Sequence, residues 1–176
     1  MSKYLFVEGY YDEIFVKKIS EQLQIKCEIK IVKYAEMQDA KVSRYLQSLI
    51  SQKIHFLFIA DRDIDHYKSI VDREKELYRR YPFLNSSNHN SSNHILVIPE
   101  IEGWYIAGLD QRSVKKLKLK NLPPPDDCTK EKFIATLPSQ LDGTPIRNDI
   151  LDLYDIHFAE TRSSSFRKFV SIIEHW

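Results

Sequence analysis

Six acidic residues follow strongly apolar stretches of the sequence, where folding could gather them around a metal ion. Glu8 comes directly after one apolar run, and Asp61 and Asp63 come after the most apolar stretch of the chain. Crowded carboxylates repel one another unless a cation lies among them. Oxygen ligands favour a hard ion such as Mg²⁺ or Mn²⁺. The sequence therefore predicts a site for one or two such ions, formed by Glu8, Asp12, Asp61, Asp63, Glu100 and Glu102.

The chemistry that such a site could perform is phosphoryl chemistry. A bound ion can hold phosphate oxygens, and a pair of ions can stabilise both the attacking and the leaving oxygen. Gly9 follows Glu8, and a glycine would let a phosphate approach the backbone closely. The N-terminus of the first predicted helix would face the same position.

Each carboxylate taken singly has a plainer interpretation as a solvated turn or cap residue. Asp12 alone could be a first-turn residue that favours the helix dipole. Asp61 and Asp63 alone could be a surface pair, although Asp65 continues their alternate spacing, which would place all three on one face of an extended segment. The joint placement of acidic residues after three separate apolar stretches favours the metal site.

A parallel sheet would bring these residues together. Apolar runs bounded by helical periodicity give the order βαβαβαβ, which is typical of a Rossmann-like α/β fold. We expect a four-stranded, mostly parallel sheet with helices on both faces and its site at the carboxyl ends of the strands. In the third helix, the residues expected to face the core are Ile70, Val71, Leu77 and Tyr78. The predicted strands are 4–7, 27–31, 54–60 and 94–98, and the predicted helices between them are 11–23, 42–50 and 67–80.

The sequence after the fourth strand changes character. Gly108 is a plausible stop for a short helix, and a lysine-rich run and a proline-rich linker follow it. We predict a core over residues 1–108 and a helical C-terminal extension over 109–176 that packs on the core, within a single domain. The predicted helices of this part are 100–107, 130–137, 146–154 and 164–175, and the lysine-rich run spans 115–120.

Composition indicates a cytoplasmic globular protein. The chain has 176 residues, 26 Lys and Arg against 25 Asp and Glu, and two cysteines in no metal-binding spacing. A formal net charge of +1 does not indicate a nucleic-acid binder, so any basic surface must be local. No apolar run approaches the length of a membrane span, and no secretion signal is evident.

Four segments of the sequence resemble the TOPRIM domain found in topoisomerases, primases and OLD-type nucleases. Segment 7–12, Val-Glu-Gly-Tyr-Tyr-Asp, resembles the first TOPRIM motif, and segment 58–63, Phe-Ile-Ala-Asp-Arg-Asp, resembles the second. Segment 98–105, with its Glu-Ile-Glu-Gly-Trp run, and segment 162–169 are similar to stand-alone TOPRIM-like proteins related to the OLD nucleases. The likeness to TOPRIM covers roughly residues 3–108.

This resemblance implies a Mg²⁺-dependent nuclease that cuts DNA or RNA. Glu8 would act as acid or base beside the metal, and Asp61 and Asp63 would be catalytic metal ligands. The remaining acids, Asp12, Glu100 and Glu102, would complete one or two metal positions. OLD-type enzymes also use a basic residue near the scissile phosphate, for which Lys168, Arg162 and Arg167 are the candidates.

The resemblance also implies partners, and it leaves other functions open. The chain lacks the phosphate-binding loop of an ATPase, so an ATPase would be a separate subunit, as in an anti-phage defence system. A homodimer and no membrane are expected. One alternative is a non-catalytic metal-binding regulatory or adaptor module in a nucleic-acid-processing complex. Another is a receiver-like or phosphatase-like domain in which Asp61 accepts a phosphoryl group.

Overall fold

Four strands form one wholly parallel sheet at the centre of the protein. In the computed structural model, which describes residues 2–63, 67–85, 94–138 and 143–176, the strand order is β2-β1-β3-β4. Every neighbouring pair is parallel, where the sequence predicted a mostly parallel sheet. The strands are β1 (Lys3–Val7), β2 (Ile29–Lys33), β3 (Phe56–Asp61) and β4 (His94–Val97). The α/β fold class predicted from the sequence is confirmed.

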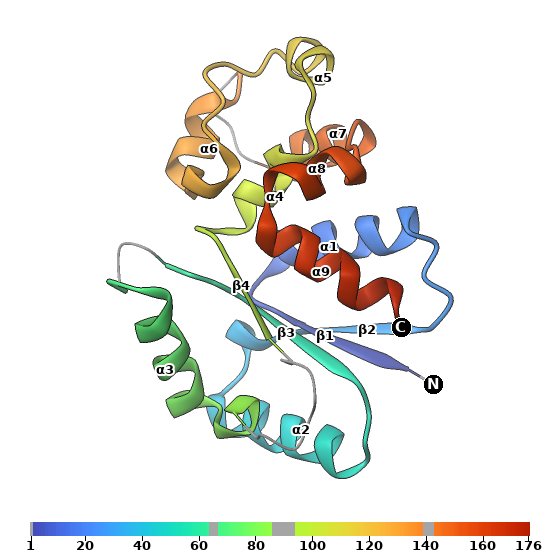
Figure 1. The fold of residues 1–176 in the computed structure, drawn as a ribbon, viewed down its shortest axis with the longest axis vertical. Helices are drawn as coiled ribbons and strands as arrows, with labels where there is room; N and C mark the ends of the chain where they lie inside the picture. The colour runs from blue at the N-terminus through green and yellow to red at the C-terminus, as the bar shows by residue number, and fades with distance from the viewer. Residues whose placement is uncertain (1, 64–66, 86–93, 139–142) are drawn as a thin grey trace.

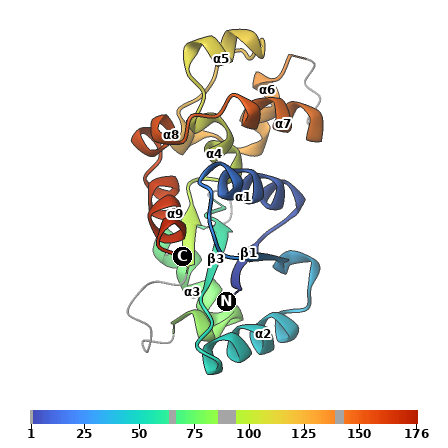
Figure 2. The same ribbon diagram turned by 90° about the vertical axis from the view of Figure 1, so that its right-hand side faces the viewer.

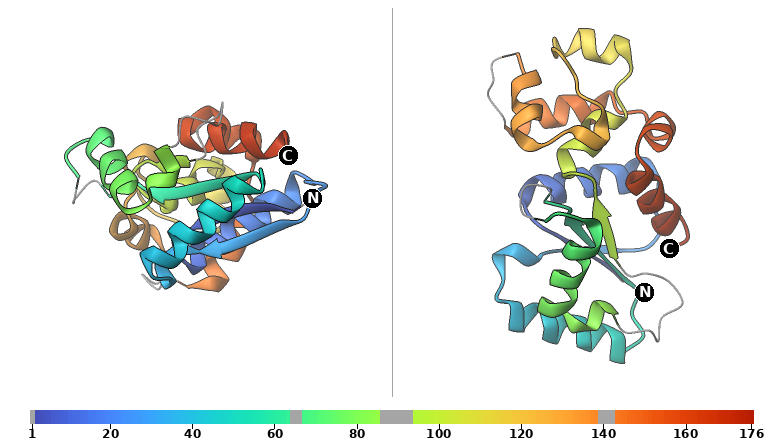
Figure 3. Two further views of the ribbon diagram at one scale, coloured as in Figure 1. Left: turned by 90° about the horizontal axis from the view of Figure 1, so that it is seen from below. Right: turned by 60° about the vertical axis from the view of Figure 1, so that its left-hand side comes forward.

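Helices cover both faces of this sheet, as predicted. Figure 1 shows α1 (Tyr10–Gln22) and α9 (Ser164–Glu174) on one face, and α2 (Asp39–Ser51) and α3 (Ile70–Arg80) on the other. Figure 3 shows the same two layers from two further directions. Because successive strand residues point to opposite faces, β1 supplies apolar side chains to both layers.

Two hydrophobic clusters result from this alternation. Leu5 and Val7 of β1 belong to the larger cluster, which continues through α1 to the C-terminal helices. Phe6 belongs to the smaller cluster, in which it stacks on Phe58 of β3 with ring centroids 5.8 Å apart. Tyr34, in a single 3-10 turn (Tyr34–Glu36) after β2, completes this second layer. Strands β1 and β3 are thus largely buried on both sides, which explains why they read as continuous apolar runs, whereas no residue of the edge strand β2 is buried.

Within the described residues, the C-terminal part contains helices and the segments that connect them, and no strand. Its helices α5 to α8 form a group beyond the end of the sheet, next to α4 (Figure 2). Two of them, α5 and α8, were not predicted; each begins at an aspartate, Asp110 or Asp155, whose side chain accepts a hydrogen bond from a backbone N–H of the first turn. The helices are α4 (Ile101–Ala107), α5 (Gln111–Lys116), α6 (Lys130–Thr136), α7 (Thr144–Asp152) and α8 (Ile156–Arg162), and two further 3-10 segments are Pro82–Asn85 and Pro125–Asp127.

Helix α3 differs from its prediction in where it starts and in which side it buries. Ser69 caps the helix by accepting a hydrogen bond from the Asp72 N–H, so the helix begins at residue 70 and not at 67. The first-turn residues Ile70 and Val71 are then 39% and 55% exposed, and the prediction that they face the core is wrong. Leu77 is buried as predicted.

Two further sequence predictions concern a membrane-spanning helix and the position of Asp65. None of the helices in the described part of the chain has both the length and the apolarity that crossing a membrane requires. Asp65, which continues the acidic run after β3, lies outside the described residues.

Candidate metal centre

A small acidic pocket lies where the carboxyl ends of the strands meet the C-terminal helices. Its volume is about 290 Å³. Five of the six acids singled out in the sequence line it, and Asp63 lies just beyond it, two residues after Asp61. The lining residues are Glu8, Gly9, Tyr10, Tyr11, Asp12, Asp61, Glu100, Ile101, Glu102, Lys130 and Glu131. We call this cavity the carboxylate pocket.

Asp61, the last residue of β3, has the least satisfied carboxyl group of the pocket. Its Oδ1 atom is buried and has no hydrogen-bond partner among the described residues. Burial raises the pKa of this carboxyl well above its usual range, and the negative charges of Asp12 and Glu8 raise it further. A buried polar oxygen without a partner is costly, so Asp61 is the place in the pocket where a cation would relieve the most unfavourable energy.

Asp12 lies one helical turn past Glu8, at the third position of α1. Its Oδ2 atom accepts a hydrogen bond from the backbone N–H of Gly9 at 3.3 Å, which is the contact of a helix-capping residue. Only 7% of Asp12 is exposed. Burial, and next the charge of Glu8, raise its pKa to about 7. Asp12 therefore caps its helix and also belongs to the electrostatically coupled group of acids.

Glu8 follows β1 directly and is held by a buried tyrosine. The Tyr34 hydroxyl donates a hydrogen bond to Oε2 of Glu8 at 3.2 Å. The Tyr34 ring is buried and stacks on Phe58 with centroids 4.3 Å apart. Burial raises the pKa of Tyr34 well above its usual range, so this hydroxyl keeps its proton and remains a donor. Glu8 thus has a fixed neutral partner on the side of the sheet.

The two glutamates of the third acidic stretch are bound to the C-terminal helices. Oε2 of Glu100 accepts a hydrogen bond from the backbone N–H of Lys130, the first residue of α6, at 2.7 Å. Oε1 of Glu102 accepts one from Nη2 of Arg147 in α7 at 2.8 Å. Burial raises the pKa of Glu100. Both glutamates therefore line the pocket and already accept a hydrogen bond from a helix of the C-terminal extension.

Asp63 adopts the left-handed backbone conformation, with φ of 59°. Its Oδ2 atom lies 4.0 Å from Nη2 of Arg73. The Nε of Arg73 donates a hydrogen bond to the backbone carbonyl of Asp61 at 2.9 Å, so one buried arginine of α3 fixes the backbone that carries both aspartates. Aspartate tolerates a positive φ better than most residues do.

The sequence analysis missed the two buried arginines, Arg73 and Arg147. Each lies four residues before a buried leucine of its own helix, Leu77 or Leu151, and so shares the buried face. A charged residue on an otherwise apolar helical face could have indicated a buried ion pair. The sequence offered no indication of which carboxylate each arginine would meet.

The three basic residues proposed for the scissile phosphate lie elsewhere. Lys168 donates a hydrogen bond to the carbonyl of His94 at the start of β4, whereas Asp61 pairs with Val97 at the end of that strand. The Arg162 guanidinium donates to backbone carbonyls at the end of α4, and Arg167 donates to the carbonyl of Glu160. Helix α9 runs along the face of the sheet, which places Lys168 near the amino end of β4 and not in the pocket.

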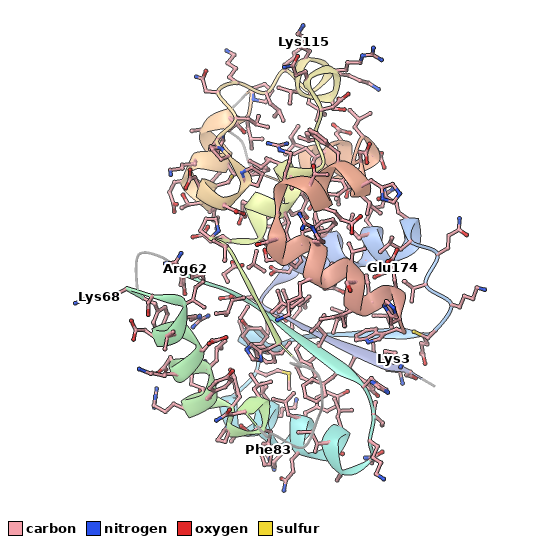
Figure 4. The ribbon with its side chains drawn as sticks, in the orientation of Figure 1. Lys3, Arg62, Lys68, Phe83, Lys115 and Glu174 are labelled. Carbon is pink, nitrogen blue, oxygen red and sulfur yellow. The ribbon has the colours of Figure 1, made fainter. Side chains whose placement is uncertain are left out.

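The lysine-rich run is also remote from the pocket. Lys115 is exposed in α5, and Figure 4 shows it at the top of the molecule. Arg62, which directly follows the pocket residue Asp61, lies near the middle of the same view. Lys130 is the lysine that lines the pocket.

The residues of the pocket fit a hard divalent cation in their chemistry. Carboxylate oxygens predominate among the polar side-chain groups, and the unpartnered Oδ1 of Asp61 is an oxygen that a cation would satisfy. In the parts of the chain that the structure describes, no three His, Cys, Asp or Glu side chains already lie in an arrangement that could hold an ion. Metal binding would therefore have to draw the carboxylates together.

We compared the chain with known protein families, curated proteins and solved structures. No protein-family model, no curated protein and no solved structure gives a match to this chain. The structure shows a four-stranded parallel α/β sheet with C-terminal helices, and the resemblance to TOPRIM domains rests on the sequence motifs alone.

Proposed function

We propose that the protein is a TOPRIM-type domain that binds Mg²⁺ or Mn²⁺ in the carboxylate pocket and hydrolyses phosphodiester bonds in DNA or RNA. The observation that carries this proposal is the buried, unpartnered Oδ1 of Asp61, close enough to Glu8 and Asp12 for their charges to raise its pKa. This group lies at the carboxyl edge of a parallel sheet, where such folds form their sites.

The pocket residues have distinct roles in this proposal. Asp61, Asp63 and Asp12 bind the ion or ions, and Glu100 and Glu102, which line the same pocket, complete one or two metal positions. Glu8 holds the proton that is moved during hydrolysis, and the Tyr34 hydroxyl orients its carboxylate. A bound divalent ion would supply charge stabilisation to the phosphate oxygens and a more acidic water.

Gly9 supports the proposal that a phosphate enters the pocket. A side chain at this position would meet only Asp12, at an ordinary contact distance of 3.8 Å. The protein itself therefore does not require a glycine there, and the space left open lies in the wall of the carboxylate pocket. A phosphate could then approach the backbone between Glu8 and Tyr10.

The biological setting follows from the resemblance alone. We propose that the protein acts as the nuclease effector of a partner ATPase, in an anti-phage defence system, with DNA or RNA as its substrate. A homodimer is the simplest assembly for such an effector.

A second function is favoured by one observation. Glu100 and Glu102 are already engaged by the N–H of Lys130 and by Arg147, and no ligand set is assembled among the described residues. A metal-binding adaptor module, which holds an ion or a partner without cutting nucleic acid, would have this arrangement.

Cleavage of a mixed panel of plasmid, linear duplex, single strands and tRNA tests the two functions. The intact chain is compared with Glu8→Gln and Asp61→Asn in Mg²⁺ and in Mn²⁺. Asp149→Asn serves as the matched control, because Asp149 is exposed and lies in α7, outside the pocket. The nuclease requires cutting that is lost in both pocket variants and in EDTA but is kept in the control.

The other outcomes are equally informative. Mn²⁺ binding that is lost in Asp61→Asn, without any cutting, would favour the adaptor module. Cutting that persists in both pocket variants would place the activity outside the carboxylate pocket, and a chain that neither cuts nor binds metal would refute the metal centre itself.

A further inference from the structure

Arg147 occupies the most completely enclosed charged position among the described residues. Its side chain is 0% exposed although it belongs to the C-terminal extension. The guanidinium carbon lies 4.0 Å from the ring centroid of Tyr11 and 4.7 Å from those of Tyr105 and Phe133. These rings belong to α1, α4 and α6, so Arg147 in α7 is enclosed by three other helices.

The charge of Arg147 is directed at the pocket. Its Nη2 donates to Oε1 of Glu102 at 2.8 Å, and Glu102 lines the carboxylate pocket although only 5% of it is exposed. Burying a guanidinium is expensive, and apolar side chains that replace both partners of a buried ion pair often give equal or better stability. The aromatic surroundings alone therefore do not explain why an arginine occupies this position.

The helix that carries Glu102 is held in place independently. A side chain on Gly103 would come within 2.4 Å of the carbonyl oxygen of Pro125, which means that α4 packs against that backbone as closely as a glycine permits. The Tyr105 hydroxyl donates to the carbonyl of Tyr11 at 2.8 Å and ties α4 to α1. With its backbone fixed on two sides, the direction of the Glu102 carboxylate depends on its contact with Arg147.

We propose that Arg147 is a positioning residue of the metal site: it holds the carboxylate of Glu102 in a fixed orientation in the wall of the pocket. This inference rests on the proposed metal-binding function. It assigns to the C-terminal extension a direct part in that function, because the arginine comes from α7 and the carboxylate from α4. Arg147 itself is too deeply buried to touch a substrate, so it acts through Glu102.

Calorimetric titration with Mn²⁺ tests this inference on the intact chain, Arg147→Met, Glu102→Gln and the double variant. Partners that orient a metal ligand typically contribute about 10- to 100-fold to affinity. We expect each single variant to weaken Mn²⁺ binding by about 10-fold or more. The double variant should bind no more weakly than Glu102→Gln, because an arginine that acts through Glu102 has nothing left to act on.

Two controls separate positioning from simple stabilisation. Arg112→Met removes an exposed arginine of α5 and should leave the Mn²⁺ affinity unchanged. Arg147→Lys keeps the charge without the planar fork and should restore part of the affinity lost in Arg147→Met. If Arg147→Met does not fold, the same cycle is run with Arg147→Lys.

The outcomes distinguish this inference from the proposed function. A merely structural arginine would reduce the fraction of chains that bind while leaving their dissociation constant unchanged, and that result would overturn the inference. Losses that add in the double variant would overturn it as well. Asp61→Asn reports on the metal site separately: if the intact chain binds no Mn²⁺, or binds it equally well without Asp61, the proposed function fails first and the inference fails with it.

Discussion

The two walls of the carboxylate pocket differ in how their negative charge is compensated. On the wall built by Glu100 and Glu102, each carboxylate has a firm donor from the extension, the N–H of Lys130 or the guanidinium of Arg147. On the wall built by Glu8, Asp12 and Asp61, no ion pair with Lys, Arg or His occurs among the described residues. We call these the paired wall and the unpaired wall.

Burial raises the pKa of Glu100 on the paired wall, but the larger rises in pKa occur on the unpaired wall. On the unpaired wall, burial and mutual repulsion raise the pKa of Asp12 to about 7 and that of Asp61 well above its usual range. Uncompensated charge of this kind marks functional sites more often than structural ones. Under the proposed function, a cation would enter at the unpaired wall, and the paired wall would provide a fixed part of the pocket lining.

The largest effect is expected on the paired wall, from Arg147→Met. Removing one partner of a buried ion pair leaves the other charge uncompensated, which typically costs 3–5 kcal/mol. We expect the free energy of unfolding, measured by urea denaturation, to fall by about 4 kcal/mol. Replacing both partners, in Arg147→Met with Glu102→Leu, should recover much of that loss. A single variant as stable as the intact chain would show that the ion pair does not hold this wall.

The next effect is on the unpaired wall, from Asp61→Asn. We expect Mn²⁺ affinity to fall by more than about 100-fold, because outer partners of a metal ligand alone are worth roughly 10- to 100-fold. Glu100→Gln, on the paired wall, should cost no more than about 10-fold, since its carboxylate is already bonded within the protein. Equal losses in the two variants would remove the distinction between the walls.

The pH dependence of stability is a third test. Asp12 has a higher pKa folded, about 7, than its ordinary value of 3.8, so the folded state binds more protons between these values. Its contribution is fully present below pH 3.8 and is lost as the pH rises through about 7. In EDTA, the free energy of unfolding should fall by roughly 2 kcal/mol from about pH 5 to about pH 8.

Asp61 changes in the same direction, and Asp12→Asn should remove part of the decline. The carboxylates with lowered pKa values, such as Asp39 and Asp110, titrate below this window and do not obscure it. Urea denaturation at several pH values measures the effect. A stability that rises over this range would contradict the expected repulsion.

The smallest effect is expected from Tyr34→Phe. Losing the hydrogen bond to Glu8 should weaken Mn²⁺ affinity by about 5-fold, equivalent to roughly 1 kcal/mol. Tyr81→Phe is the matched control, because its hydroxyl donates to Asp39 at 2.8 Å within the same layer of the protein but away from the pocket. The control should lose stability and keep its metal affinity; a similar change in both variants would leave Tyr34 with no special relation to Glu8.

The sheet and the position of the pocket could be predicted from the sequence because both follow from local patterns. Apolar strands of four to six residues separated by amphipathic helices dictate a parallel sheet, and a parallel sheet brings Glu8, Asp61 and Glu100 to one edge. The first helix was predictable in the same way, from apolar residues four apart.

What could not be predicted depends on contacts between distant segments. Arg147 lies 45 residues from Glu102, and nothing in the local sequence of either indicates the other. Lys168 belongs to a motif-like segment, but the direction of α9 along the sheet carries it to the start of β4. Helix α8 was missed although its capping residue, Asp155, directly follows the predicted helix 146–154, because a short helix of seven residues gives little periodicity.

The separation of Glu102 from Arg147 along the chain also has a consequence for biosynthesis. A ribosome makes the chain from its N-terminus, so the acidic residues of the pocket emerge well before the arginine that balances one of them. The larger hydrophobic cluster likewise cannot be completed before Phe166 and Phe169 of α9 have been synthesised. The nascent protein would therefore complete its acidic pocket only after α7, and its larger hydrophobic cluster only after α9, has left the ribosome.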